Sequence, residues 1–347
     1  MKFDPGSIYF VREKLQNNTM SQFIKIGLVK DPRTPEDRLS EHQTGNPNLL
    51  ILESISGESG LHTDAVHYVE KQLHNLFSKH RVSGEWFILE EPELLSSAIR
   101  QAQDLASEIS KKIPTVIAAA ELDEILGDKK PHDQTEKLRE IASSLAFADT
   151  YNKGLKKLVK EINSFYKSES NEDTAEEIAK FVNIIEIFPE ARFDPNKFIA
   201  KQPASLIEQY STHFTAVKST FTLITAFKKN VGSDESYQKA LADYGISIQE
   251  AKAAKDYSKL ADIKEKLERD IKALEWQLVY TEAQLKVACG EALGIDGIVS
   301  WTRELEEKTE YDFGRLYAEK PEIYLDPDHF SQAKPSKRAV KVYRKAR

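Results

Sequence analysis

Ser7-Ile8-Tyr9-Phe10-Val11 and Phe23-Ile24-Lys25-Ile26-Gly27 are two apolar runs that indicate how the first part of this chain folds. A polar segment with Asn17-Asn18 separates them, and asparagine is typical of turns. The sequence therefore predicts an antiparallel β-hairpin. Because side chains alternate between the two faces of a strand, we expect Tyr9 and Lys25 on the same face.

Two helices and a third strand are expected after the hairpin. Arg38 follows a proline and two acidic residues, a composition typical of the first turn of a helix. The apolar run Leu49-Leu50-Ile51-Leu52 predicts the third strand. Glu70 then shares one face of a second predicted helix with His67 and His74.

The order of these residues, closed by Gly84-Glu85-Trp86-Phe87, resembles the GIY-YIG nuclease superfamily and in particular its phage-associated DNA-binding branch. The resemblance covers about the first quarter of the chain. It implies that Tyr9 lies beside the scissile phosphate and helps to activate the attacking water. It also implies that Arg38 holds the phosphate and that Glu70 ligates a single divalent metal, Mg²⁺ or Mn²⁺.

Two positions depart from the family pattern. Ser7 stands where the family has its first glycine, and Lys25 stands where it has its second tyrosine. The lysine is a feature of the branch that the chain resembles, but it removes one phenol from the groups that can transfer protons.

The chemistry of phosphodiester hydrolysis suits these residue types. Mg²⁺ keeps most of its waters, so one glutamate such as Glu70 can suffice to bind it. The planar fork of Arg38 matches two phosphate oxygens. Lys25 offers a compact charge that can neutralise phosphate or shuttle a proton. His74 is expected to support Glu70 or to pack, rather than to bind the metal itself.

Plainer roles exist for the same residues. Tyr9 can be a packing residue of a half-buried strand, and Arg38 can be a solvated residue of a helix.

Length, charge and cysteine content limit the class of protein. The chain has 347 residues, enough for two or three domains. Its formal charge of −7 argues against a protein coated in basic surface, although a local basic cleft can bind nucleic acid in an acidic chain. Cys289 is the only cysteine, which excludes an intrachain disulfide and favours the cytoplasm. We find no signal peptide and no apolar run of the ~20 residues needed to cross a bilayer.

The rest of the chain is expected to be mainly helical. A helix should run from Pro92 to about Lys112 and complete an N-terminal domain over residues 1–112. A linker is expected over 113–133, and a helical region over 134–250 with segments near 134–166, 172–188 and 203–229. A heptad-patterned helix should follow over 251–290, and a small α+β cap over 291–347. The predicted fold class is therefore α+β, with a three-stranded antiparallel sheet in the first domain.

The heptad pattern has two interpretations. Apolar residues recur at steps of three or four, with one longer step, at Leu260, Ile263, Leu267, Ile271, Leu274, Leu278 and Leu285. Such a seam makes either a coiled coil between two copies, and so a homo-oligomer, or a hairpin with another helix of the same chain.

The C-terminal region carries a short resemblance and a basic tail. Residues 284–301 are similar to the late part of YqaJ-type phage recombination nucleases, but they lack the catalytic cluster of those proteins, so we transfer no active site. The last fourteen residues contain seven basic residues and no acid. We expect contact with the DNA backbone from Lys337, Arg338, Lys341 and Arg344. The alternation of Val340 and Val342 also allows a terminal strand, which we expect to pair with residues 298–301.

The leading functional hypothesis is a metal-dependent DNA endonuclease, acting in phage DNA metabolism or in defence against phage. One alternative is a non-cleaving DNA-binding protein that retains the phosphate pocket. The other is a helical scaffold whose N-terminal domain supports assembly.

Overall fold

The hairpin lies at the centre of an N-terminal sheet. Strands β1 (Gly6–Lys14) and β2 (Met20–Lys30) pair antiparallel, with Tyr9 opposite Gly27. Val11 stands opposite Lys25, so Tyr9 and Lys25 lie on the same face, and both predictions are confirmed.

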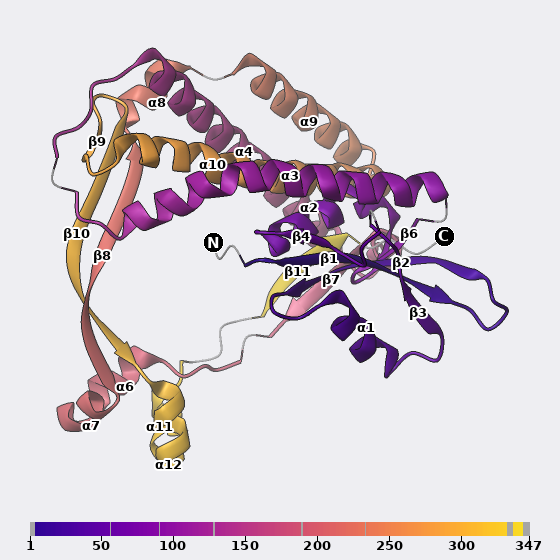
Figure 1. Ribbon diagram of the computed structural model, residues 1–347, viewed down its shortest axis with the longest axis horizontal. Coiled ribbons are helices and arrows are strands. Elements are labelled where there is room, and N and C mark those ends of the chain that lie inside the picture. Colours follow the sequence, from indigo (N-terminus) through magenta and orange to yellow (C-terminus); the bar gives the residue numbers. More distant parts are fainter. Residues whose placement is uncertain are drawn as a thin grey trace.

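The structure is a computed structural model, and its arrangement is shown in Figure 1. It describes residues 4–55, 57–89, 91–127, 129–188, 190–232, 234–331 and 336–342. The predicted α+β class is confirmed, with the antiparallel sheet first and the helical region after it.

Four shorter strands complete the sheet. β3 (Leu49–Leu52) and β4 (Leu61–Thr63) pair with β1, and β6 (Trp86–Ile88) pairs with β2 and with the edge strand β5 (Arg81–Ser83). The sheet therefore has six strands and not the three expected. The additional strands have three residues each, too few to show an alternating pattern in the sequence.

Helix α1 (Pro35–Gln43) packs on the face of the sheet that carries Tyr9. Thr34 and Asp37 form a reciprocal capping box at its start, which explains why the helix begins there. Leu39 packs against a small buried cluster that joins the helix to the sheet. That cluster contains Tyr9, Val11, Val29 and Leu50.

Helices α2 (Val66–Leu76) and α3 (Pro92–Asp123) cover the other face, with the short 3₁₀ helix η1 (Ser78–His80) between them. Ile8, Phe10, Ile24 and Ile26 of the hairpin are fully buried there. The end of α3 corrects two predictions. The helix passes Lys112, and residues 113–123, which we expected in a linker, are helical because Ile113, Val116 and Ala119 continue the buried stripe.

The helical region is built around α10 (Tyr257–Cys289), which packs against α4 (Glu136–Glu169), α9 (Glu235–Ala253), α2 and α3. The heptad seam packs against other helices of the same chain, because its leucines and isoleucines contact α4 and α9. This decides between the two interpretations of the seam in favour of intrachain packing. Association of two copies through this helix stays a prediction.

Two segments that we expected to be helical contain strands. The segment 172–188 forms only the short α5 (Ala175–Ile178) and then β7 (Val182–Ile187). The segment 203–229 forms α7 (Ala204–Gln209), β8 (Ser211–Leu223) and α8 (Thr225–Val231). Both strands are rich in β-branched and aromatic residues, and their partners lie far away in the sequence, beyond the reach of a local pattern.

A long two-stranded ribbon projects from the bundle (Figure 1). β10 (Val299–Tyr311) pairs with β8 along its whole length, and β9 (Gly294–Ile295) pairs with its first residues. Residues 298–301, expected to pair with a terminal strand, thus do contribute to a strand, but it is longer and its partner lies in the region expected to be helical.

Short helices and a cluster of aromatic residues close the far end of the ribbon. These helices are α6 (Pro195–Lys201), α7, α11 (Phe313–Glu319), α12 (Pro321–Tyr324) and the 3₁₀ helix η2 (Pro327–His329). Phe198, Tyr210 and Leu316 are buried at the centre of the cluster.

The C-terminal strand β11 (Lys337–Val342) has a different partner from the one expected. It pairs antiparallel with β7 and not with residues 298–301, because Val340 is buried among residues of α4 and α10. Among the described residues, no helix is long and apolar enough to cross a membrane.

Candidate functional site

The glycine opposite Tyr9 leaves room for the tyrosine ring. The ring is 1% exposed and lies over Gly27, where an added Cβ would come within 2.6 Å of the ring carbon Cζ. Burial raises the pKa of the Tyr9 phenol, and the nearby guanidinium of Arg38 opposes part of that rise. The hydroxyl therefore stays protonated at neutral pH.

His42 was not anticipated from the sequence and lies next to Tyr9. Its Nε2 is 3.3 Å from the Tyr9 hydroxyl. Burial lowers the pKa of His42, and the positive charges of Lys25 and Arg38 lower it further, so the imidazole is neutral at pH 7. The signal that could have found it is its position four residues after Arg38, on the same face of α1.

Arg38 lies between this pair and the solvent. It forms an ion pair with Glu41, and its side chain is 34% exposed. The guanidinium is near enough to the Tyr9 hydroxyl to affect the pKa of the phenol, yet it remains open to a ligand from outside.

Lys25 makes an ion pair with Glu85. The Nζ atom is 2.9 Å from Oε2 of Glu85, and the lysine side chain is 11% exposed. The amide of Ile26 donates to the Glu85 carbonyl at 3.0 Å, which holds the residues before β6 against β2. The lysine at this position is therefore built into the sheet and does not point freely into solvent.

Glu70 of α2 reaches the same region from the other side of the sheet. Burial raises the pKa of its carboxyl to about 7, the negative charge of Glu85 adds to the rise, and Lys25 and Arg81 oppose it. A divalent cation fits this place chemically, because it would neutralise two carboxylates that repel each other. No cluster of three or more His, Cys, Asp or Glu suited to a metal occurs in the described part of the chain.

His74 uses both of its ring nitrogens within the protein. Nε2 donates to the Ile26 carbonyl at 2.8 Å, and Nδ1 faces Nη2 of Arg81 at 3.4 Å. Burial lowers the pKa of His74, which agrees with a neutral ring that carries its proton on Nε2. The residue connects α2 to β2 one turn after Glu70.

A hollow of about 640 Å³ opens beside these residues on the Tyr9 face of the sheet. Lys25, His42 and Trp86 line it, together with the loop between α1 and β3. Gln43 shapes this loop, since its Nε2 donates to the carbonyls of Asn46 and Asn48. A phosphate-bearing ligand could therefore approach Lys25 and His42 together.

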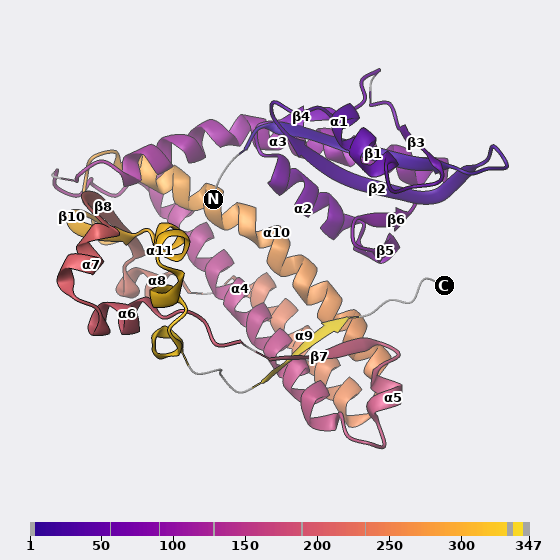
Figure 2. The ribbon, with the colours of Figure 1, turned by 90° about the horizontal axis from the view of Figure 1, so that it is seen from below.

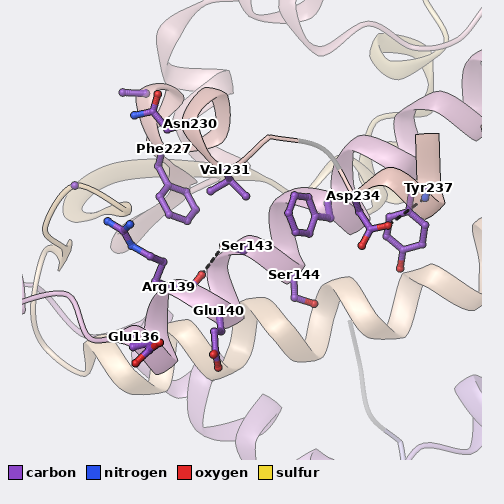
Figure 3. A pocket seen from close by; sticks show the side chains of 13 residues that line it. Glu136, Arg139, Glu140, Ser143, Ser144, Phe227, Asn230, Val231, Asp234 and Tyr237 are labelled. Carbon is purple, nitrogen blue, oxygen red and sulfur yellow. Dashed lines mark hydrogen bonds between the residues drawn. The ribbon is translucent and has the colours of Figure 1, made fainter. Parts of the chain in front are cut away.

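A second hollow, of about 780 Å³, lies among α4, α8 and α9 (Figure 3). Phe227, Val231 and Tyr237 contribute apolar surface, whereas Glu136 and Glu140 stand at the beginning of α4. Asp234 caps α9 by accepting from backbone amides. Arg139 also lines this hollow, which contains none of the candidate residues named from the sequence.

The sequence candidates fall into two groups in space. Tyr9, Lys25, Arg38 and Glu70 come from four different elements, and they lie near enough for Arg38 and Glu70 to affect the pKa of Tyr9 and for Lys25 to affect the pKa of Glu70. Arg338 and Lys341 are exposed on β11, apart from this site. Lys337 begins β11, and Arg344 lies outside the described residues.

The comparisons with known proteins agree with the extent of this domain. A family model, the T5orf172 domain, matches residues 6–109. No curated protein and no solved structure matched the chain. The matched range contains the whole N-terminal sheet, α1, α2 and every residue of the candidate site, and it ends within α3.

Proposed function

We propose that residues 6–109 form a metal-dependent site that hydrolyses phosphodiester bonds in DNA. The supporting observation is the convergence of Tyr9, Lys25, Arg38 and Glu70 from β1, β2, α1 and α2. Two cations and a carboxylate around a buried phenol are suited to a phosphate and a divalent ion. The T5orf172 match and the resemblance to a phage-associated nuclease branch support DNA as the substrate.

Each residue has a role in this proposal. Arg38 binds the phosphate with its planar fork and orients it. The Tyr9 hydroxyl and His42 Nε2 form a pair that positions the attacking water and can move a proton between them. Lys25 faces the phosphate from the sheet. A metal at Glu70, Mg²⁺ or Mn²⁺, would supply further positive charge when bound.

A second candidate function is DNA binding without cleavage. The observation that favours it is Lys25, which replaces a phenol and whose amine is already engaged by Glu85. Arg38 alone would retain affinity for phosphate. We propose phage DNA metabolism or defence against phage as the setting for either function.

The test uses supercoiled DNA with Mg²⁺, Mn²⁺ or EDTA and the full chain. We expect nicking or linearisation with metal, and a loss of at least about a hundredfold in rate for Glu70→Ala, because charge stabilisation worth several kcal/mol is removed. The matched control is Glu58→Ala, an exposed glutamate of the same domain, which should cleave at the parent rate. Circular dichroism checks that both variants fold.

Two further variants separate the residue roles. Tyr9→Phe keeps the ring over Gly27 but deletes the hydroxyl, so it should lower turnover more than DNA affinity. Arg38→Ala should lower both. If the parent chain retards DNA in a gel but cleaves it under none of these conditions, the nuclease is contradicted and DNA binding without cleavage is supported. If Glu70→Ala cleaves at the parent rate, Glu70 has no role in the mechanism.

A further inference from the structure

Helix α4 carries a stripe of lysines on one face. The residues are Lys153, Lys156, Lys157, Lys160 and Lys167, and all five are exposed. Successive residues of an α-helix are rotated by about 100°, so steps of three, four and seven bring these side chains to the same side. We call this set the lysine stripe.

The opposite face of the same helix is in the protein core. Leu155, Ile162 and Tyr166 are buried there against α10. The lysine stripe therefore points to solvent because of how α4 is packed, and it cannot turn inward without exposing the core. Ser164, also exposed, lies within the stripe, and no apolar residue of α4 accompanies the lysines on this face between positions 153 and 167.

The stripe is poorly neutralised. Lys153 pairs with Asp149 at 2.6 Å, whereas the other four lysines make no ion pair within the described residues. By comparison, two lysines of the neighbouring helices are paired, Lys252 with Glu161 and Lys259 with Glu250. Like charges three and four residues apart destabilise a helix by about 0.2–0.5 kcal/mol per pair. The chain thus maintains a local positive surface despite a net charge of −7.

We propose that the lysine stripe binds the phosphate backbone of duplex DNA. It extends over fourteen residue steps, or about 21 Å at 1.5 Å per residue, long enough to face several phosphates. Lysine ammonium groups neutralise phosphates as point charges without reading bases, so the binding is independent of sequence. The absence of an apolar residue to insert on this part of α4 argues against an anionic membrane as the partner.

The stripe is separate from the candidate active site. α10 lies between α4 and the N-terminal sheet (Figure 2). β11, with its exposed Lys341, packs against α4 as well. This inference rests on the proposal that DNA is the substrate. The lysine stripe adds a second surface for DNA, on the helical region, which raises the affinity for DNA and takes no part in hydrolysis.

The test measures DNA affinity of the full chain as a function of salt. Lys156→Gln, Lys157→Gln and Lys160→Gln are combined in one variant. The matched control combines Lys130→Gln, Lys228→Gln and Lys229→Gln, which make the same charge change at exposed positions outside the stripe. For a 40-base-pair duplex, we expect the stripe variant to lose about tenfold or more in affinity at 0.15 M salt. The slope of the logarithm of the binding constant against the logarithm of the salt concentration is negative, and its magnitude should decrease by about 2–3 because fewer counterions are released. The control should stay within about twofold.

The outcomes distinguish this inference from the proposed function. Unchanged affinity and salt slope in a folded stripe variant would overturn the stripe as a DNA surface, even if the parent chain cleaves DNA. A parent chain that binds DNA through the stripe but does not cut it would support the stripe and contradict the nuclease. Binding of the parent chain to phosphatidylserine vesicles but not to DNA would overturn the inference. Equal losses in stripe variant and control would also overturn it, since they would show a nonspecific charge effect.

Discussion

At the scale of single residues, the site depends on the close approach of a tyrosine to a glycine. Gly27 closes the second apolar run of the hairpin and has no side chain, so the Tyr9 ring can lie flat over β2 with its hydroxyl at His42. Any larger residue at position 27 would occupy the place of the ring. The absence of a side chain at position 27 thus determines where the Tyr9 phenol lies.

Gly27→Ala is therefore expected to destabilise the protein by about 1–3 kcal/mol, because a methyl group forced against the buried ring causes overpacking. The same change should lower any activity that depends on Tyr9. Gly45→Ala is the control, since an added Cβ there meets no atom within 4 Å. Urea unfolding followed by circular dichroism gives both values. Equal stabilities of the two variants would show that the ring moves aside at no cost.

At the scale of elements, β11 is both a structural strand and a carrier of positive charge. Val340 is buried with α4 and α10, whereas Lys341 next to it points to solvent. Removing the C-terminal residues would therefore delete a strand of the core together with the charges. Single substitutions separate the two properties better than a truncation does.

Val340→Ala should lower the free energy of unfolding by about 1–3 kcal/mol through lost apolar burial. Lys341→Gln should change it by less than about 0.5 kcal/mol, as exposed substitutions usually do. Urea denaturation of the full chain measures both. If the lysine variant were as destabilised as the valine variant, Lys341 would have a structural role that its exposure does not suggest.

At the scale of the whole molecule, α10 joins the N-terminal domain to the helical region. Gln72 and Asn75 of α2 donate to the carbonyls of Lys272 and Arg269 on α10. At the C-terminal end of the helix, Cys289 is fully buried in the cluster that contains Trp301 of β10. Unfolding of either part should therefore also destabilise this helix.

Cys289 provides a probe of this arrangement. Burial raises the pKa of its thiol to about 11, so only about a thousandth is thiolate at pH 8. Labelling by a thiol reagent should be very slow in native buffer and fast in guanidinium chloride. A raised pKa in the folded state favours folding below the thiol's unfolded pKa, and this contribution is lost as the pH rises through about 11. Labelling should therefore accelerate at alkaline pH. Rapid labelling of the native chain at pH 7 would contradict the burial of Cys289 and the closed packing of α10.

The features that could be predicted from the sequence are those that depend on a local pattern of residues. The alternation of apolar residues predicts the hairpin and the shared face of Tyr9 and Lys25, and the proline and acidic residues before Arg38 predict the start of α1. The long helices α4 and α10 were predictable for the same reason, since an apolar stripe of period 3.6 is visible in any window along them.

The features that depend on partners far apart in the sequence could not be predicted and became known from the folded chain. β8 pairs with β10 across a sequence separation of 86 residues at Lys218 and Glu304, and β7 pairs with β11 near the end of the chain. His42, Arg81 and Glu85 join the candidate site because α1, β5 and the start of β6 converge on β2. The heptad seam was visible in the sequence, but which surface covers it depends on the packing of α4 and α9. Pairing and packing of this kind are set by which arrangement buries the most apolar surface, and a local pattern does not contain that information.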